Sequence, residues 1–239
     1  MTLKQFKFSS EEDFIYYLRE LILLVHKNIN KYEEQVKELE LYIEEHKLIE
    51  RPKRVISPKV YEDFRGRLLF TSNYLLNAFG DQADLGTSYQ NYRKAARKQN
   101  IKLLDLSDEE QAELNSLTTS RDWSAHIPAS IFHSSEERAN NLRKKGPITY
   151  PEFNKFQGLW LVSLYENSYK GLQGFKKWKN ILMREYSVLT DEPCMIVPFS
   201  IDVREISDLE IPEISWLIQT KKIKSISEIK EYYNSNNQT

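Results

Sequence analysis

The sequence contains few of the residues that form turns, glycine and proline, and almost no cysteine, the residue that forms disulfide cross-links. Its 239 residues include only 7 glycines, 8 prolines and 1 cysteine. So few turn-forming residues leave little room for the many short strands of a β-sandwich or barrel. The lone cysteine, Cys194, excludes an internal disulfide framework and suits a reducing compartment.

Long apolar runs and a dominant charge are also missing. The longest aliphatic run, Leu21 to Val25, is far too short to span a bilayer, and Met1 to Ser10 has no apolar signal core. The net charge of -1 comes from 34 basic and 35 acidic residues, so any contact with nucleic acid must be local. We therefore expect a cytoplasmic protein without membrane contact.

The residues that are plentiful predict helices. Hydrophobic residues make up 40% of the chain, enough for a core, and many recur at helical steps of three and four. Helix-start signals include the capping box Ser107-x-x-Glu110 and Ser57 followed by Pro58. The expected helices cover about Ser10 to Lys47, Pro58 to Phe79, Tyr89 to Gln99, Ser107 to near Ile127, Ser135 to Lys145, and from Tyr150 past Leu182 to Tyr186.

These segments predict an all-α fold, a bundle of four to five helices with a long N-terminal helix. After Asp191 the prolines Pro193, Pro198 and Pro212 break any long helix. We therefore expect residues 1–190 to form the helical domain. Residues 191–239 are expected to form a C-terminal extension of mixed irregular and short helical structure, packing on the bundle or trailing from it.

One segment, Ser120 to Pro128, combines groups that can do phosphoryl chemistry. Arg121 carries a permanent charge that can stabilise a phosphate, and His126 titrates near neutral pH and can move protons. Asp122 lies four residues before the histidine, where it can orient the imidazole. Pro128 ends the helix beside them. These three residues are the candidate catalytic group.

The spacing of Arg121 and His126 restricts how they can act together. Five residues of regular helix turn the side chain by about 500°, which leaves the two roughly 140° apart. A shared site then needs either a loosened helix end or two copies of the motif meeting across a two-fold axis. The alternative is structural: Arg121 pairs with a carboxylate from another helix, and His126 caps terminal carbonyls.

Arg121-Asp122-x3-His126, near the end of a helix in an all-helical chain, resembles the Arg-x4-6-His motif of the HEPN superfamily. The resemblance covers about Ser10 to Tyr186. It implies a helical bundle that forms a homodimer and acts as a metal-independent endoribonuclease of the toxin, phage-defence or RNA-processing type. It also implies an RNA substrate and, for a toxin, a neutralising protein partner. Some family members are thought to be noncatalytic, so a helical protein-interaction module is the alternative function.

A second, weaker candidate is a basic helical segment. The candidate RNA-binding residues are Arg93, Lys94, Arg97 and Lys98. A basic helical face can follow a phosphate backbone, although the same pattern fits a solvated face behind a core stripe of tyrosine and alanine. We expect no metal site and no cofactor, because the sequence contains no metal-ligand box and no phosphate-binding glycine loop.

Overall fold

The structure is a computed structural model that describes residues 6–83, 86–125 and 155–198, with the side chains of 123–125 excepted. The chain divides into two compact units, Met1–Ile196 and Val197–Thr239. Everything that follows concerns the first unit. The expected helix at 135–145 and almost all of the C-terminal extension lie outside the described residues.

The described part of the first unit is mostly helical, with one pair of two-residue strands, which confirms the predicted all-α fold. Its elements are α1 (Glu11–Glu45), β1 (Val55–Ile56), α2 (Pro58–Gly80), α3 (Tyr89–Lys98), α4 (Asp108–Ala125), β2 (Phe156–Gln157) and α6 (Gly158–Thr190). The two strands form one antiparallel pair at one end of the bundle. The predicted long N-terminal helix is α1, and its bounds lie within two residues of the expected ones.

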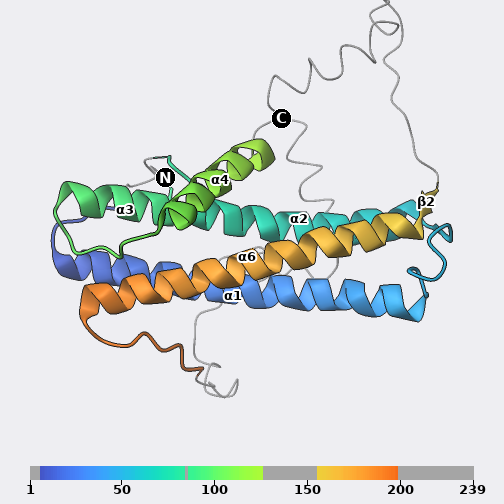
Figure 1. Ribbon diagram of the computed structural model, residues 1–239, viewed down its shortest axis with the longest axis horizontal. Coiled ribbons are helices and arrows are strands. Elements are labelled where there is room, and N and C mark those ends of the chain that lie inside the picture. Colours follow the sequence, from blue (N-terminus) through green and yellow to red (C-terminus); the bar gives the residue numbers. More distant parts are fainter. Residues whose placement is uncertain (1–5, 84–85, 126–154, 199–239) are drawn as a thin grey trace, which may run out of the picture. The chain divides into compact units, whose positions relative to one another are not determined.

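Three long helices lie side by side and enclose the core (Figure 1). α1 packs against both α2 and α6 and runs antiparallel to them, while α4 lies obliquely against α2. The predicted apolar stripe of α1 faces inward along the whole helix, because residues three and four apart share one face. Its buried members include Phe14, Leu18, Leu21, Val25, Ile29, Val36, Leu39 and Ile43.

The helix starts follow from local capping. Ser57 is the N-cap of α2 with Pro58 in its first turn, as predicted. Ser10 is the N-cap of α1, and the Asp13 carboxylate accepts hydrogen bonds from the backbone amides of Ser9 and Ser10. Side chains in the first turn therefore fix where the helices begin.

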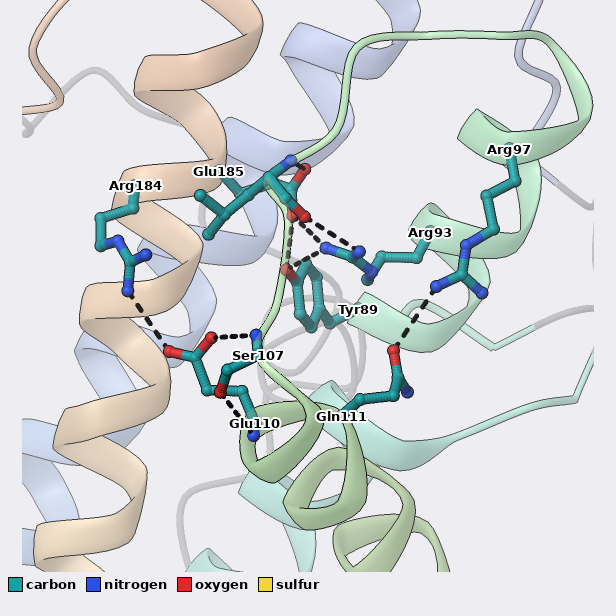
Figure 2. A network of polar contacts seen from close by, with 9 residues as sticks. Tyr89, Arg93, Arg97, Ser107, Glu110, Gln111, Arg184 and Glu185 are labelled. Atoms are coloured by element: carbon teal, nitrogen blue, oxygen red, sulfur yellow. Dashed lines mark hydrogen bonds and ion pairs between the residues drawn. The ribbon is translucent and has the colours of Figure 1, made fainter.

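The start of α4 has the predicted capping box. The Ser107 amide donates to Glu110 Oε2 at 3.0 Å, and the Glu110 amide donates to Ser107 Oγ at 3.2 Å (Figure 2). Arg184 of α6 also lies 3.4 Å from Glu110 Oε1. The pKa of Glu110 is lowered mainly by the hydrogen bond from the Ser107 backbone amide, and the positive charge of Arg184 lowers it further.

This lowered pKa makes the cap sensitive to pH. A carboxylate whose pKa is lower in the folded state stabilises it above the unfolded pKa, and that contribution is lost as the pH falls through the folded pKa. Glu110→Gln should lower the free energy of unfolding at pH 7 by about 0.5–1 kcal/mol. The difference should fade below the ordinary value of 4.5. Urea unfolding from pH 7 to pH 3 checks this, and Glu109→Gln in the same turn should show a smaller change.

The last long helix begins later than the sequence predicts. We expected a helix from Tyr150, but Phe156 and Gln157 pair with β1 as a strand, and α6 starts at Gly158. The Gly158 amide donates to the carbonyl of Arg54 at 2.7 Å. Phe156 and Gln157 therefore form a strand with a distant segment instead of the expected helix. The periodicity of the local sequence does not reveal such a partner.

None of the helices in the described ranges has the length and apolar character needed to cross a membrane.

Candidate functional site

The motif helix α4 lies very close to the C-terminal end of α2. A Cβ atom added to Gly80 would lie 2.9 Å from both the N and Cα atoms of Thr118. Only a residue without a side chain allows the two backbones to come this near. The close approach places Arg121, one turn further along α4, beside Asn77 and Asp81 at the end of α2.

The Arg121 guanidinium uses each of its three nitrogens. Nε donates to Asn77 Oδ1, Nη2 pairs with Asp81 Oδ1, and Nη1 pairs with Asp122 Oδ1, all at 2.9 Å. Three acceptors around one planar fork fix both its position and its orientation. The Arg121 side chain is 17% exposed. It therefore lies at the edge of the α2–α4 contact rather than in the core.

Asp81 is itself held firmly. It is the C-cap of α2, and its Oδ1 also accepts from the Ala83 amide at 2.9 Å. Ser88 Oγ donates to the Asp81 carbonyl. A Cβ atom on Gly86 would lie 2.8 Å from Asp81 Cγ, so the following loop wraps closely around this carboxylate. Asp81 is therefore a fixed anchor for the guanidinium.

The two carboxylates at Arg121 differ in their exposure to water. The Asp81 side chain is 15% exposed and the Asp122 side chain 54%. An incoming phosphate can compete with the exposed Asp122 far more readily than with the anchored Asp81. With both pairs intact, the charge on the guanidinium is compensated, and the arrangement ties α4 to α2.

The structure therefore brings together Arg121 and Asp122. The structural alternative for Arg121 predicted an ion pair with a carboxylate from another part of the chain, and Asp81 provides that carboxylate. The described partner of Asp122 is Arg121, since its Oδ1 accepts from Nη1. His126 lies outside the described residues, so its place beside Arg121, and the choice between a loosened helix end and a composite site, stay predictions.

Sequence reasoning missed Asn77 and Asp81. Both lie on one stripe of α2, four residues apart, and both are polar where the helix ends. That spacing is a usable signal for a polar site at a helix terminus, but only the tertiary contact shows that Arg121 is its partner.

The difference in exposure leads to a prediction for the two carboxylates. Asp81→Ala should lower the free energy of unfolding by about 1–2 kcal/mol, because it removes a charge-assisted contact to a largely buried guanidinium. Asp122→Ala removes a pair at an exposed carboxylate and should cost at most about 0.5 kcal/mol. Chemical denaturation measures both, and equal costs would contradict the anchor role of Asp81.

The basic segment on α3 is divided between core and surface. Lys94, Arg97 and Lys98 are exposed, whereas Arg93 is buried. The Arg93 Nη1 atom pairs with Glu185 Oε2 at 2.6 Å, and Nη2 donates to the Leu104 carbonyl at 3.1 Å (Figure 2). Arg93 therefore belongs to the core and cannot reach a phosphate backbone, contrary to our expectation for this residue.

Glu185 is the centre of this buried network. Its Oε2 also accepts from the Tyr89 hydroxyl at 2.5 Å, and its Oε1 accepts from the Leu104 amide at 2.8 Å. Burial raises the pKa of Tyr89 and of Tyr92, and the nearby Glu185 charge raises both further. Both phenols therefore stay protonated, and the network joins α3, α6 and the loop before α4.

Comparisons of the chain with protein-family models, curated proteins and solved structures find no match. Within the part of the chain that the structure describes, no group of three or more His, Cys, Asp or Glu residues is placed to hold a metal ion. Cys194 is partly buried, and burial raises the pKa of its thiol.

Proposed function

We propose that the protein is an HEPN-like, metal-independent endoribonuclease that uses Arg121 and His126. One observation supports this best: Asn77 and Asp81 fix the guanidinium on one side, and Nη1 pairs with the exposed Asp122. A catalytic arginine needs its orientation fixed by surrounding contacts, together with one edge that a substrate can reach.

In the proposed reaction, the 2′-hydroxyl of RNA attacks the adjacent phosphate. His126 takes the hydroxyl proton and returns a proton to the leaving 5′-oxygen. Arg121 stabilises the charge of the phosphorane as Asp122 turns away from Nη1 toward the imidazole. The products are a 2′,3′-cyclic phosphate and a free 5′-hydroxyl.

A second candidate is a noncatalytic helical interaction module. The observation that favours it is charge compensation, because Arg121 already pairs with both Asp81 and Asp122. A guanidinium matched by two carboxylates attracts an anion weakly. In this case Arg121 serves to fix α4 on α2, and the surfaces of the bundle bind a partner.

Cleavage of labelled single-stranded RNA in excess chelator distinguishes the two functions. The endoribonuclease predicts cleavage by the parent protein and loss of at least about a hundredfold in Arg121→Ala and in His126→Ala. Arg65→Ala serves as the matched control, because Arg65 is an exposed, ion-paired arginine on α2 and should leave cleavage unchanged.

Loss of stability in Arg121→Ala must be separated from loss of chemistry. Each variant is therefore assayed well below its own thermal midpoint, and the cyclic phosphate end is identified by mass spectrometry. Equal cleavage by the parent and both variants would rule out this site. No cleavage by a folded parent protein would support the interaction module.

A further inference from the structure

A groove of about 590 Å³ runs between α1 and α2. α1 contributes Lys27 and Lys31 together with Leu23 and, at one end, the acidic Glu20, and α2 contributes Tyr74. Thr87, in the loop after α2, lines the groove as well. Both lysines are exposed and lie one helical turn apart, so they form a basic edge along α1.

On the α2 side, Tyr74 lines the groove, and the Phe70 ring lies next to it, beside Lys31. Phe70 is 68% exposed and Tyr74 is 43% exposed, one turn apart on α2. The Lys31 ammonium lies 5.7 Å from the centre of the Phe70 ring, a cation–π contact that joins the basic edge to the aromatic one. Exposed rings next to lysines are the pattern on which bases stack while the phosphates meet positive charge.

The exposed rings share one face of α2 with a residue that holds Arg121. Phe70, Tyr74 and Asn77 follow one another at steps of four and three, so they occupy one stripe of α2, and Asp81 caps the end of that helix. The last two of these residues hold the Arg121 guanidinium. Tyr74 of the groove therefore lies one helical turn from Asn77, which accepts a hydrogen bond from Arg121.

We propose that this groove binds single-stranded RNA and leads it to Arg121, with bases on Phe70 and Tyr74 and phosphates at Lys27 and Lys31. This assignment rests on the proposed endoribonuclease function for its direction, but binding in the groove can be tested apart from cleavage. Lysine is depleted in the cores of protein interfaces, so two lysines beside the rings favour a nucleic acid over a protein partner.

The test measures binding of a short, fluorescent single-stranded RNA to the full chain carrying His126→Ala, which prevents loss of the probe by cleavage. Phe70→Ala and Tyr74→Ala should each weaken binding by about fivefold or more. The double variant Lys27→Gln/Lys31→Gln should lower the slope of log K against log salt by about 1.4. Matched controls are Tyr169→Ala and Lys170→Gln, an exposed tyrosine and lysine on α6, which should bind like the parent.

Two results would overturn the assignment while leaving the proposed function intact. In one, the groove variants bind RNA as tightly as the parent. In the other, the groove variants and the α6 control variants lose RNA binding to the same extent, while the parent protein still cleaves RNA. Self-association abolished by Phe70→Ala, with no RNA binding by the parent, would also overturn it and make the groove a protein interface. Binding that depends on the groove in a protein that never cleaves would support the groove and reject the endoribonuclease.

Discussion

Glu185→Leu is expected to lower the free energy of unfolding by about 3–5 kcal/mol. The Glu185 side chain is fully buried, and it accepts hydrogen bonds from the Arg93 guanidinium, the Tyr89 hydroxyl and the Leu104 amide. Removing the carboxylate leaves a buried guanidinium without its counter-charge and takes away the acceptor of the other two donors. Urea or guanidinium unfolding, followed by circular dichroism, measures the loss.

A double variant tests whether the cost comes from the uncompensated charge. Arg93→Met with Glu185→Leu replaces the ion pair by apolar side chains of similar size and should recover most of the loss. The exposed pair of Lys102 and Asp191, at 2.6 Å, is the matched control. Lys102→Gln should cost less than about 1 kcal/mol. A Glu185→Leu cost as small as that of the control would contradict the assigned role of the network.

Gly80→Val is expected to lower the free energy of unfolding by about 3 kcal/mol. The atoms nearest to a new side chain at this position belong to the backbone of Leu117 and Thr118, which cannot rotate away as a side chain can. The variant must therefore push α4 from α2. Because Arg121 follows on α4, its contacts with Asn77 and Asp81 should be lost as well.

Gly66 on the same helix provides the control for backbone effects. A Cβ atom there meets nothing within 4 Å, so Gly66→Val should change stability by less than about 0.5 kcal/mol. The proposed endoribonuclease function further predicts that the Gly80 variant loses RNA cleavage at temperatures where it remains folded, whereas the Gly66 variant retains it. Equal stability of the two variants would show that the close contact of α2 and α4 has no energetic importance.

Much of the fold follows from local patterns. The apolar stripe of α1 and the caps at Ser57 and Ser107 depend on residues a few positions apart, and the structure confirms these predictions. The predicted start of α6 was wrong, because Phe156 pairs with Ile56, about a hundred residues earlier in the chain. Periodicity within one segment contains no information about such a partner.

At the candidate site, some contacts could be predicted from neighbouring residues in the sequence, whereas others depend on distant segments. The sequence predicted Asp122 as a neighbour of Arg121 and, in the structural alternative, a carboxylate from another helix as its partner. Asn77 and Asp81 could not be named, because they meet Arg121 only where Gly80 lets two helices approach closely. Arg93 fitted a basic surface in the sequence, yet pairing with Glu185 of α6 places it in the core.

The sequence by itself determined the helical class, the long first helix, several helix starts and the position of the Arg121-Asp122 motif near the end of a helix. Each of these depends on hydrogen bonds and side-chain faces within one or two helical turns. Only the tertiary structure shows that Asp81 pairs with Arg121, that Glu185 pairs with Arg93, and where lysines meet exposed rings. Those contacts join helices distant in sequence, and the energy of a buried or partly buried charge depends on the partner that packing brings to it.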